Sequence, residues 1–265
     1  MRHAYRSINL FWQAKLRPSL ISVIIPASSL FLLFALWLLA SATIPQFLLP
    51  TPLMTLEETS RVLRSQQFYF HAGRTLQRIL YSFVIGFLCS NGLAFASNSW
   101  KHIEQFWKPL LILGLSIPSI VAIFIGIVVF GSRGPVAIIM VSFLLIPELY
   151  LILFPAYRNL STELAEMTKA FHISRAVYIR DVAFPQLAPF LITATRVGIS
   201  VGWKITILAE VFTLSDGIGY QIHYYFNLFS IKGVLAWFTG FALIMIIIEY
   251  GILLTLEKAF SLNKK

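Results

Sequence analysis

Two basic side chains lie inside a strongly apolar run in the C-terminal half of the chain. Arg196 and Lys204 fall within residues 189–209, which are otherwise mostly apolar. A Lys or Arg near the centre of a bilayer costs roughly 2.5–3.5 kcal/mol on insertion scales, so such residues usually face a cavity or a partner. A low-dielectric surrounding also strengthens the attraction of a cation for an anion. The pattern therefore indicates a polar path that binds a small anion, although Arg196 could instead snorkel to the membrane edge.

A helix through this run would gather its polar side chains on one side. An arginine, a serine and a tryptophan recur at i, i+4 and i+7, and a lysine lies near the edge of the same face. We assign five residues to this polar path: Arg196, Ser200, Trp203, Lys204 and Glu210. Two further carboxylates lie in other apolar runs. Glu249 fits an ion pair with another helix better than a solute contact, and Glu148 is compatible with either role.

The chain lacks the residue patterns of catalysis and of metal or nucleotide binding. The single cysteine, Cys89, excludes an intrachain disulfide and a Cys-rich zinc or iron–sulfur site. The five histidines are scattered, without a ligand spacing such as H-E-x-x-H. The sequence has neither a G-x-S-x-G nucleophile motif nor a G-x-x-x-x-G-K-[ST] phosphate loop. We therefore predict no catalytic residue, no metal and no cofactor bound by this chain, so any nucleotide must bind to another subunit.

The composition is that of a membrane protein. Hydrophobic residues make up 58% of the 265 residues and charged residues only 12%, whereas a soluble domain carries about 25% charged residues. Intrinsic disorder is excluded because it requires low hydrophobicity and high charge. The net charge of +10 suits Lys and Arg held on the cytoplasmic side of a membrane, and we predict no nucleic-acid partner.

Six runs are long and apolar enough to span a bilayer, which takes about 20 helical residues. They cover residues 20–44, about 75–96, 109–130, 135–155, 189 to about 209, and 234–256. The first run ends in Ala40-Ser41-Ala42, a sequence typical of signal-peptide cleavage sites. Its uncharged stretch is longer than the roughly 7–15 residues of a signal-peptide core, so we predict an uncleaved membrane helix. The fold class predicted is an all-α integral membrane protein of about six transmembrane helices.

The distribution of Lys and Arg predicts the orientation of these helices. More of these residues lie in the segments that are cytoplasmic when the N-terminus is inside, so both termini are predicted to be cytoplasmic. Residues 1–19 then form a cytoplasmic N-terminal segment, residues 20–256 the transmembrane domain and residues 257–265 a cytoplasmic tail. The outer loop, 45–74, has apolar residues spaced as in a short amphipathic helix at the membrane surface.

The polar segment 158–188, between the fourth and fifth runs, is predicted to face the cytoplasm. Ser161 or Thr162 can cap a helix that has two glutamates in its first turns. Apolar residues at 164, 167 and 171 follow one face of that helix, and a second amphipathic run ends before Pro185. Such a two-helix segment could lie on lipid or could dock a soluble partner.

This segment resembles the EAA loop of bacterial ABC importer permeases. Glu166 matches the glutamate of that motif, Ser174-Arg175 a common Ser-Arg pair, and Phe184-Pro185 the apolar-Pro end. Met167 and Thr168 stand where the two alanines are usual, and His172 stands where a glycine would permit a tight turn. The resemblance implies contacts with an ATPase for these residues: Glu163, Glu166, Thr168, His172, Ser174, Arg175 and Pro185.

The resemblance covers about residues 45–260 and extends to the permeases of nitrate, sulfonate, taurine and thiamine-precursor importers. It rests on five short motifs in the expected order: Leu49-Pro50-Thr51-Pro52, Ser116-Ile117-Pro118-Ser119, Phe130-Gly131, Ala209-Glu210 and Gly217-Ile218-Gly219-Tyr220. It implies the type I ABC importer permease fold in the bacterial cytoplasmic (inner) membrane. Alternating access would need flexible points, for which Pro118, Pro147, Gly198 and Gly202 are candidates, although Pro and Gly are frequent in membrane helices anyway.

The resemblance also implies the partners and the activity. Two copies of the chain, as a homodimer, would form the pore. Two cytoplasmic ATPase subunits would bind ATP and Mg, and a periplasmic or lipid-anchored binding protein would deliver a small anionic solute such as a sulfonate, taurine or nitrate. The chain itself would not be an enzyme.

Three alternatives remain open at this point. The same machinery could import a thiamine pyrimidine precursor or another heteroaromatic. An ion-driven secondary transporter would favour paired carboxylates at mid-membrane. A membrane lipid enzyme would need a His, Asp or Glu cluster at a membrane boundary, and no such cluster is visible in the sequence.

Overall fold

The computed structural model describes residues 20–213 and 215–261. These residues are almost entirely helical, which confirms the predicted all-α class. The chain divides into two compact units whose boundary lies between Glu58 and Thr59. The predicted N-terminal segment, 1–19, and residues 262–265 of the predicted tail lie outside the described residues, whereas residues 257–261 continue α12 (Ile231–Ser261).

The first unit contains α2 (Leu20–Thr43) and the start of α3 (Pro52–Leu63). α2 corresponds to the first predicted span, and α3 to the amphipathic helix predicted in the outer loop. The Nε1–H of Trp37 donates a hydrogen bond to the carbonyl of Pro50 at 3.0 Å. This bond links α2 to the segment that leads into α3. An indole N–H usually finds such a partner when it is buried.

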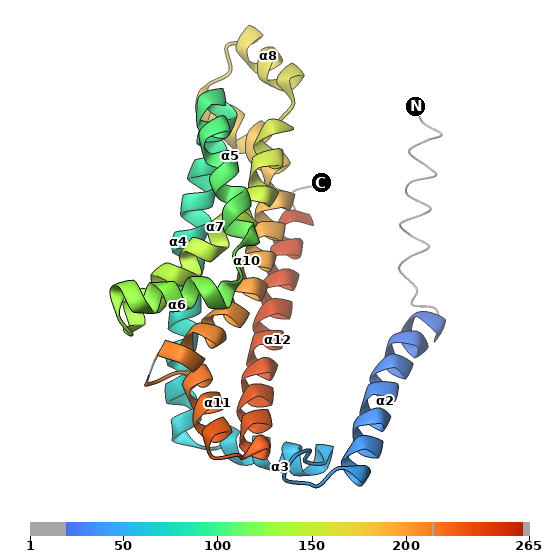
Figure 1. The fold of residues 1–265 in the computed structure, drawn as a ribbon. Helices are drawn as coiled ribbons and strands as arrows, with labels where there is room; N and C mark the ends of the chain where they lie inside the picture. The colour runs from blue at the N-terminus through green and yellow to red at the C-terminus, as the bar shows by residue number, and fades with distance from the viewer. Residues whose placement is uncertain (1–19, 214, 262–265) are drawn as a thin grey trace. The chain divides into compact units, whose positions relative to one another are not determined.

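The second unit holds the remaining helices. In chain order its elements are α4 (Gln66–Ser99), α5 (Lys101–Ser116), α6 (Ser119–Phe130), α7 (Gly134–Arg158), α8 (Thr162–Ala170), α9 (Arg175–Val177), the π-helical turn η1 (Tyr178–Ala183), α10 (Phe184–Thr213), α11 (Ile218–Asn227) and α12 (Ile231–Ser261). Among them α4, α7, α10 and α12 run lengthwise (Figure 1). α8 lies at one end of this unit and α11 at the other, and α6 crosses the bundle (Figure 1).

Four of the described helical segments are long and apolar enough to cross a membrane. They are Gln66–Ser99, Gly134–Arg158, Arg175–Phe212 and Ile231–Gly251, and they contain the second, fourth, fifth and most of the sixth predicted spans. The count rises to five if α5 and α6 together form one span. In α2 the described apolar stretch, Ala27–Thr43, is shorter than a full span. The structure thus supports four or five spans where the sequence predicted about six.

The third predicted span, 109–130, is not one continuous helix. α5 ends at Ser116, α6 begins at Ser119, and the two helices meet at an angle of 101°. Pro118 causes the break, because it has no N–H to donate and disfavours helical geometry at the residue before it. Ile117 accordingly takes an extended conformation, with φ −79° and ψ 122°.

Small residues let α4 and α7 pack closely. The face of α4 that meets α7 carries Ser82, Gly86, Ser90 and Ala94, all buried. A Cβ on Gly86 would lie 3.1 Å from the Cβ of Leu145, so there is little space for a larger residue. Close approach through small side chains is the usual way that helices associate in lipid, where no hydrophobic effect drives them together.

Candidate functional site

The loop segment predicted to dock a partner begins with the well-capped helix α8. The Ser161 side chain accepts a hydrogen bond from the N–H of Leu164 at 3.2 Å. At the other end of α8, the N–H of Ile173 donates to the carbonyl of Thr168 at 2.9 Å. The N–H of His172 donates to the carbonyl of Lys169 at 3.1 Å. This pair of bonds is a Schellman motif, which needs a left-handed residue where the helix ends.

His172 is that left-handed residue, with φ +53°. The sequence resemblance places a glycine here, and the structure shows that the chain makes the glycine-type turn with a histidine. The left-handed conformation costs a residue with a Cβ roughly 1–2 kcal/mol. The tight turn is therefore retained, at some cost in local stability.

The predicted coupling residues divide into exposed and structural side chains. Glu163, Glu166 and Arg175 are exposed, and so is Pro185, which follows η1. Thr168 is buried and its hydroxyl donates to the carbonyl of Ala165 at 2.8 Å. Ser174 accepts from the N–H of Val177 and so caps α9.

An apolar surface accompanies these exposed charges. Large side chains of the segment are exposed although they are hydrophobic: Leu164, Met167, Phe171, Ile173, Val177 and Ile179. Phe171 is the most exposed of them, at 74%. Several exposed apolar side chains in one short segment are typical of a protein or membrane interaction site.

A cavity of about 240 Å³ lies where α5, α6, α7 and α10 meet. Its lining consists of Gly114, Leu115, Ile117, Ser119, Leu144, Glu148, Val201, Lys204 and Ile205. The break between α5 and α6 forms one wall, so the first residue of α6 faces the space. Lys204 therefore lines a cavity, with its side chain exposed in the single chain, whereas Glu148 is half-buried.

Two side chains of opposite charge share this cavity. Lys204 comes from α10 and Glu148 from α7, directly after Pro147. Within the described part of the chain neither side chain has an ion-pair partner within 4.0 Å. The cavity can thus offer one cationic and one anionic contact to a small molecule.

The other predicted path residues lie elsewhere. Arg196 is exposed and Ser200 is half-buried on α10. Trp203 faces α12, where its ring lies 6.5 Å from that of Phe238 and 6.4 Å from that of Phe241. The structure therefore does not bring the five predicted residues to one place.

Glu210 is fully buried in an ionic cluster that joins α4, α10 and the start of α11. Its carboxylate accepts from Nη1 of Arg78 at 2.7 Å, from the hydroxyl of Thr75 at 2.8 Å and from the N–H of Gly219 at 2.9 Å. Arg78 also pairs with Asp216. Buried charges are tolerated only when they are paired and hydrogen-bonded in this way.

The loop before α11 wraps tightly around this carboxylate. The N–H of Ile218 donates to the hydroxyl of Thr75 at 2.8 Å, and that of Gly217 to Nδ1 of His71 at 3.0 Å. Gly217 has φ +106°, and a Cβ at that position would collide with the carboxylate of Glu210. Sequence reasoning missed the partners of Glu210, although Gly217-x-Gly219 so soon after it was a signal that the backbone approaches something closely.

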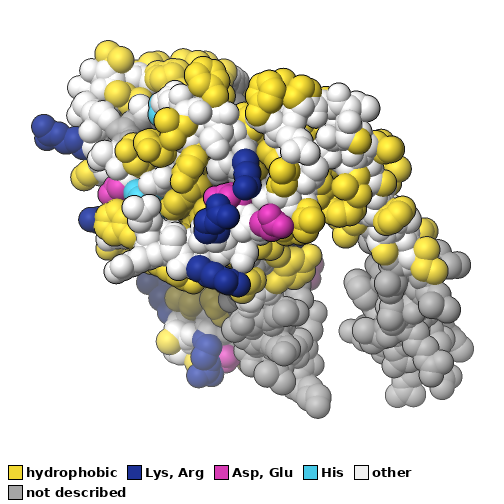
Figure 2. All heavy atoms as spheres, turned by 90° about the horizontal axis from the view of Figure 1, so that it is seen from below, with side chains coloured by type: hydrophobic (Ala, Val, Ile, Leu, Met, Phe, Trp, Pro, Cys, Tyr) yellow, Lys and Arg dark blue, Asp and Glu magenta, His cyan; other side chains and the backbone are white. Residues whose placement is uncertain are grey.

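The end of the second unit that carries α11 presents charged side chains amid apolar surface (Figure 2). Arg74 belongs to this end: it is half exposed and lies 3.4 Å from a carboxylate oxygen of Asp216. Arg61 and Arg64 are exposed as well. Among the described residues, no group of three or more His, Cys, Asp or Glu is arranged to hold a metal ion.

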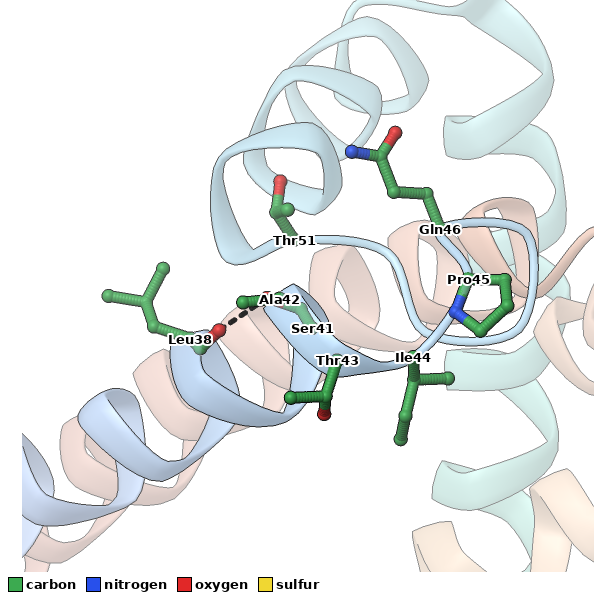
Figure 3. A pocket seen from close by; sticks show the side chains of 8 residues that line it. All are labelled: Leu38, Ser41, Ala42, Thr43, Ile44, Pro45, Gln46 and Thr51. Atoms are coloured by element: carbon green, nitrogen blue, oxygen red, sulfur yellow. Dashed lines mark hydrogen bonds between the residues drawn. The ribbon is translucent and has the colours of Figure 1, made fainter.

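A second hollow, of about 530 Å³, lies within the first unit at the end of α2 (Figure 3). It is lined by Leu38, Ser41, Ala42, Thr43, Ile44, Pro45, Gln46 and Thr51. None of these side chains is charged, and the hydroxyl of Ser41 is already bonded to the carbonyl of Leu38 at 2.9 Å. The charged cavity in the second unit is therefore the stronger candidate for a solute site.

Comparison with known families decides the class of the protein. Residues 70–256 match the family described as binding-protein-dependent transport system inner membrane component. The chain belongs to this family. The resemblance seen in the sequence is confirmed, and the permease is a multi-pass transport component of the inner membrane, not an enzyme.

Relatives of the permease share most of its length. It is 21% identical over 227 residues to the taurine transport system permease protein TauC of Escherichia coli. This match covers 83% of this chain and 82% of the TauC chain. It is 23% identical to the nitrate import permease protein NrtB of Synechocystis, over 76% of each chain. In fold it is similar to a chain of the MetNI methionine ABC transporter in inward-facing conformations, with a TM-score of 0.57 at 16% identity, covering 76% of this chain and 95% of that one.

Proposed function

We propose that the permease forms the membrane path of an ATP-driven importer for a small anionic solute. The observation that carries the proposal is Lys204, a cation in an apolar helix that faces a cavity and has no carboxylate partner within 4.0 Å among the described residues. Its side chain is exposed in the single chain and lines an otherwise mostly apolar wall, where the attraction for an anion grows as the local dielectric falls. The relatives named for taurine and nitrate support an anionic group on the solute.

The proposed machine has further subunits. Two copies of the permease pair as a homodimer, and two cytoplasmic ATPases bind ATP and Mg²⁺. A periplasmic or lipid-anchored protein delivers the solute. The apolar and charged surface of α8 supports ATPase docking, because it is exposed and both ends of the helix are capped by hydrogen bonds. The Lys and Arg distribution supports a cytoplasmic position for this surface and for both termini.

Replacing Lys204 with methionine is expected to lower anion uptake about ten- to a hundredfold, because a hydrogen bond to a charged group contributes roughly 1.5–3 kcal/mol. The measurement is ATP-dependent uptake of ethanesulfonate, nitrate and taurine into vesicles that contain the permease, its ATPase and its binding protein. Lys108→Met is the matched control, since Lys108 is exposed on α5 and does not line the cavity. Unchanged anion uptake by Lys204→Met, or transport of neutral solutes alone by the wild type, would contradict the proposal.

Replacing Glu166 with lysine is expected to separate the ATPase from the membrane subunit. A charge reversal at a docking surface removes one attraction and adds a repulsion, so solute-stimulated ATP hydrolysis should fall at least tenfold while membrane insertion persists. Glu57→Lys, an exposed position on α3, is the control.

Reporter fusions after Arg175 and Met54 test the orientation separately: a periplasmic signal after Arg175 would refute docking at α8.

A further inference from the structure

We propose that the cavity between α7 and α10 selects a small zwitterion, with the anionic group of the solute at Lys204 and its ammonium group at Glu148. This inference rests on the proposed function and deepens it, because it names the chemical class of the solute. It predicts that the permease favours amino-sulfonates and related amino acids over simple anions.

The lining of the cavity carries the first part of the inference. Of its nine residues two are charged, and their signs are opposite. Glu148 comes from α7 and Lys204 from α10, so the two charges lie on different walls. A solute lying between these walls would meet a cation on one side and an anion on the other.

The separation of the two charges carries the second part. Where this protein uses an ion pair for structure, the atoms are in contact, as in Arg78–Glu210 at 2.7 Å and Arg158–Glu104 at 3.5 Å. Lys204 and Glu148 face the same space but lie farther apart than the 4.0 Å of an ion pair. Neither charge compensates the other, and a solute that carries both charges would pair with both at once.

Glu148 also argues against a simple anion as the preferred solute. A carboxylate in the same cavity repels any anion that Lys204 attracts, and low dielectric strengthens that repulsion as much as the attraction. An ammonium group on the solute turns this repulsion into an attraction. The carboxylate therefore discriminates between an amino-sulfonate and a sulfonate of similar size.

The size of the cavity fits a small solute. A volume of about 240 Å³ corresponds to about eight water molecules at roughly 30 Å³ each. Taurine, with seven non-hydrogen atoms and its two charges at opposite ends, is of this size. Two of its walls are in close contact, because Gly114 of α5 packs against Pro147 of α7: a Cβ added to Gly114 would lie 3.3 Å from Cγ of the proline ring.

Exchange of Glu148 for glutamine tests the inference with a matched pair of solutes. Taurine and ethanesulfonate differ by the ammonium group, and uptake of each is measured in the same vesicles with the same binding protein. Because the binding protein is constant, a change in the ratio of the two uptakes reports on the permease. Glu148→Gln is expected to lower taurine uptake at least tenfold and to raise ethanesulfonate uptake, because the repulsion of the simple anion is removed.

Two further variants keep the test decisive. Glu148→Asp retains the charge and should retain the preference for taurine, even if Glu148→Gln assembles poorly. Glu249→Gln removes a carboxylate of α12 that does not line the cavity, and should leave the ratio unchanged.

The outcomes separate the two proposals. A ratio that Glu148→Gln leaves unchanged, or a wild type that takes up ethanesulfonate but not taurine, would overturn the zwitterion site and leave the importer of anions standing. A wild type that takes up neither solute nor nitrate would overturn both.

Discussion

Replacing Glu210 with alanine is expected to destabilise the permease by about 3–5 kcal/mol, because it leaves the buried guanidinium of Arg78 with only part of its counter-charge. It also removes the acceptor of Thr75 and of the N–H of Gly219. The readout is the thermal unfolding midpoint of the purified protein in detergent, which should fall by about 6–20 °C.

The control for Glu210→Ala is an exposed ion pair. Asp181 pairs with Arg180 at 2.7 Å, but both side chains are exposed, so Asp181→Ala should cost no more than about 1 kcal/mol. The double variant Arg78→Met/Glu210→Leu removes both buried charges and should be more stable than Glu210→Ala alone. An unfolding midpoint of Glu210→Ala equal to that of the wild type would show that the cluster contributes little.

Adding a Cβ at position 219 should destabilise the permease to an extent similar to that of Glu210→Ala. In the structure it would collide with the carbonyl oxygen of Ile207 and lie 2.6 Å from Cβ of Glu210 and 2.9 Å from N of Val211. These are backbone atoms of α10 or a Cβ attached directly to that backbone, so they cannot rotate away as the end of a flexible side chain would. Gly219→Ala is therefore expected to cost at least about 3 kcal/mol, at the upper end for overpacked sites, with loss of the folded protein as the extreme result.

The matched control for Gly219→Ala should change stability in the opposite direction. Gly92 is exposed in α4 and has nothing within 4 Å of an added Cβ. Gly92→Ala should raise the stability by roughly 0.5–1 kcal/mol, because glycine inside a helix loses more backbone entropy on folding than alanine does. Equal unfolding midpoints for the two variants would refute the packing argument.

α10 connects the three sites described above. It follows η1 at the docking segment, carries Lys204 at the cavity, and ends at the cluster around Glu210. The glycines of α10 proposed as flexible points have packing neighbours: a Cβ on Gly198 would lie 2.8 Å from the ring of Phe83. The proposed coupling thus has a continuous physical element, from the surface that would meet the ATPase to the cavity that would hold the solute.

The sequence by itself determined the class of fold and the local features of the helices. Apolar run length predicted the membrane helices α4, α7, α10 and α12, because the thickness of a bilayer sets that length. The serine that caps α8 and the docking segment were also visible, since helix caps depend on a few neighbouring residues. The third span was predicted as continuous, although Pro118 lay within it.

The tertiary structure alone decided which distant side chains meet. Glu210 was predicted to line the path by its place in the chain, and its partner Arg78 is 132 residues away on another helix. Glu148 was left open between an ion pair and a solute contact, and it shares a cavity with Lys204 only because of how α7 and α10 are rotated about their axes. Helix formation depends on neighbours along the chain, whereas helix rotation is set by packing across the bundle, such as that of Gly86 against Leu145. The spacing of polar and apolar residues can therefore place a charge on a helix face, but it does not determine which other helix that face packs against.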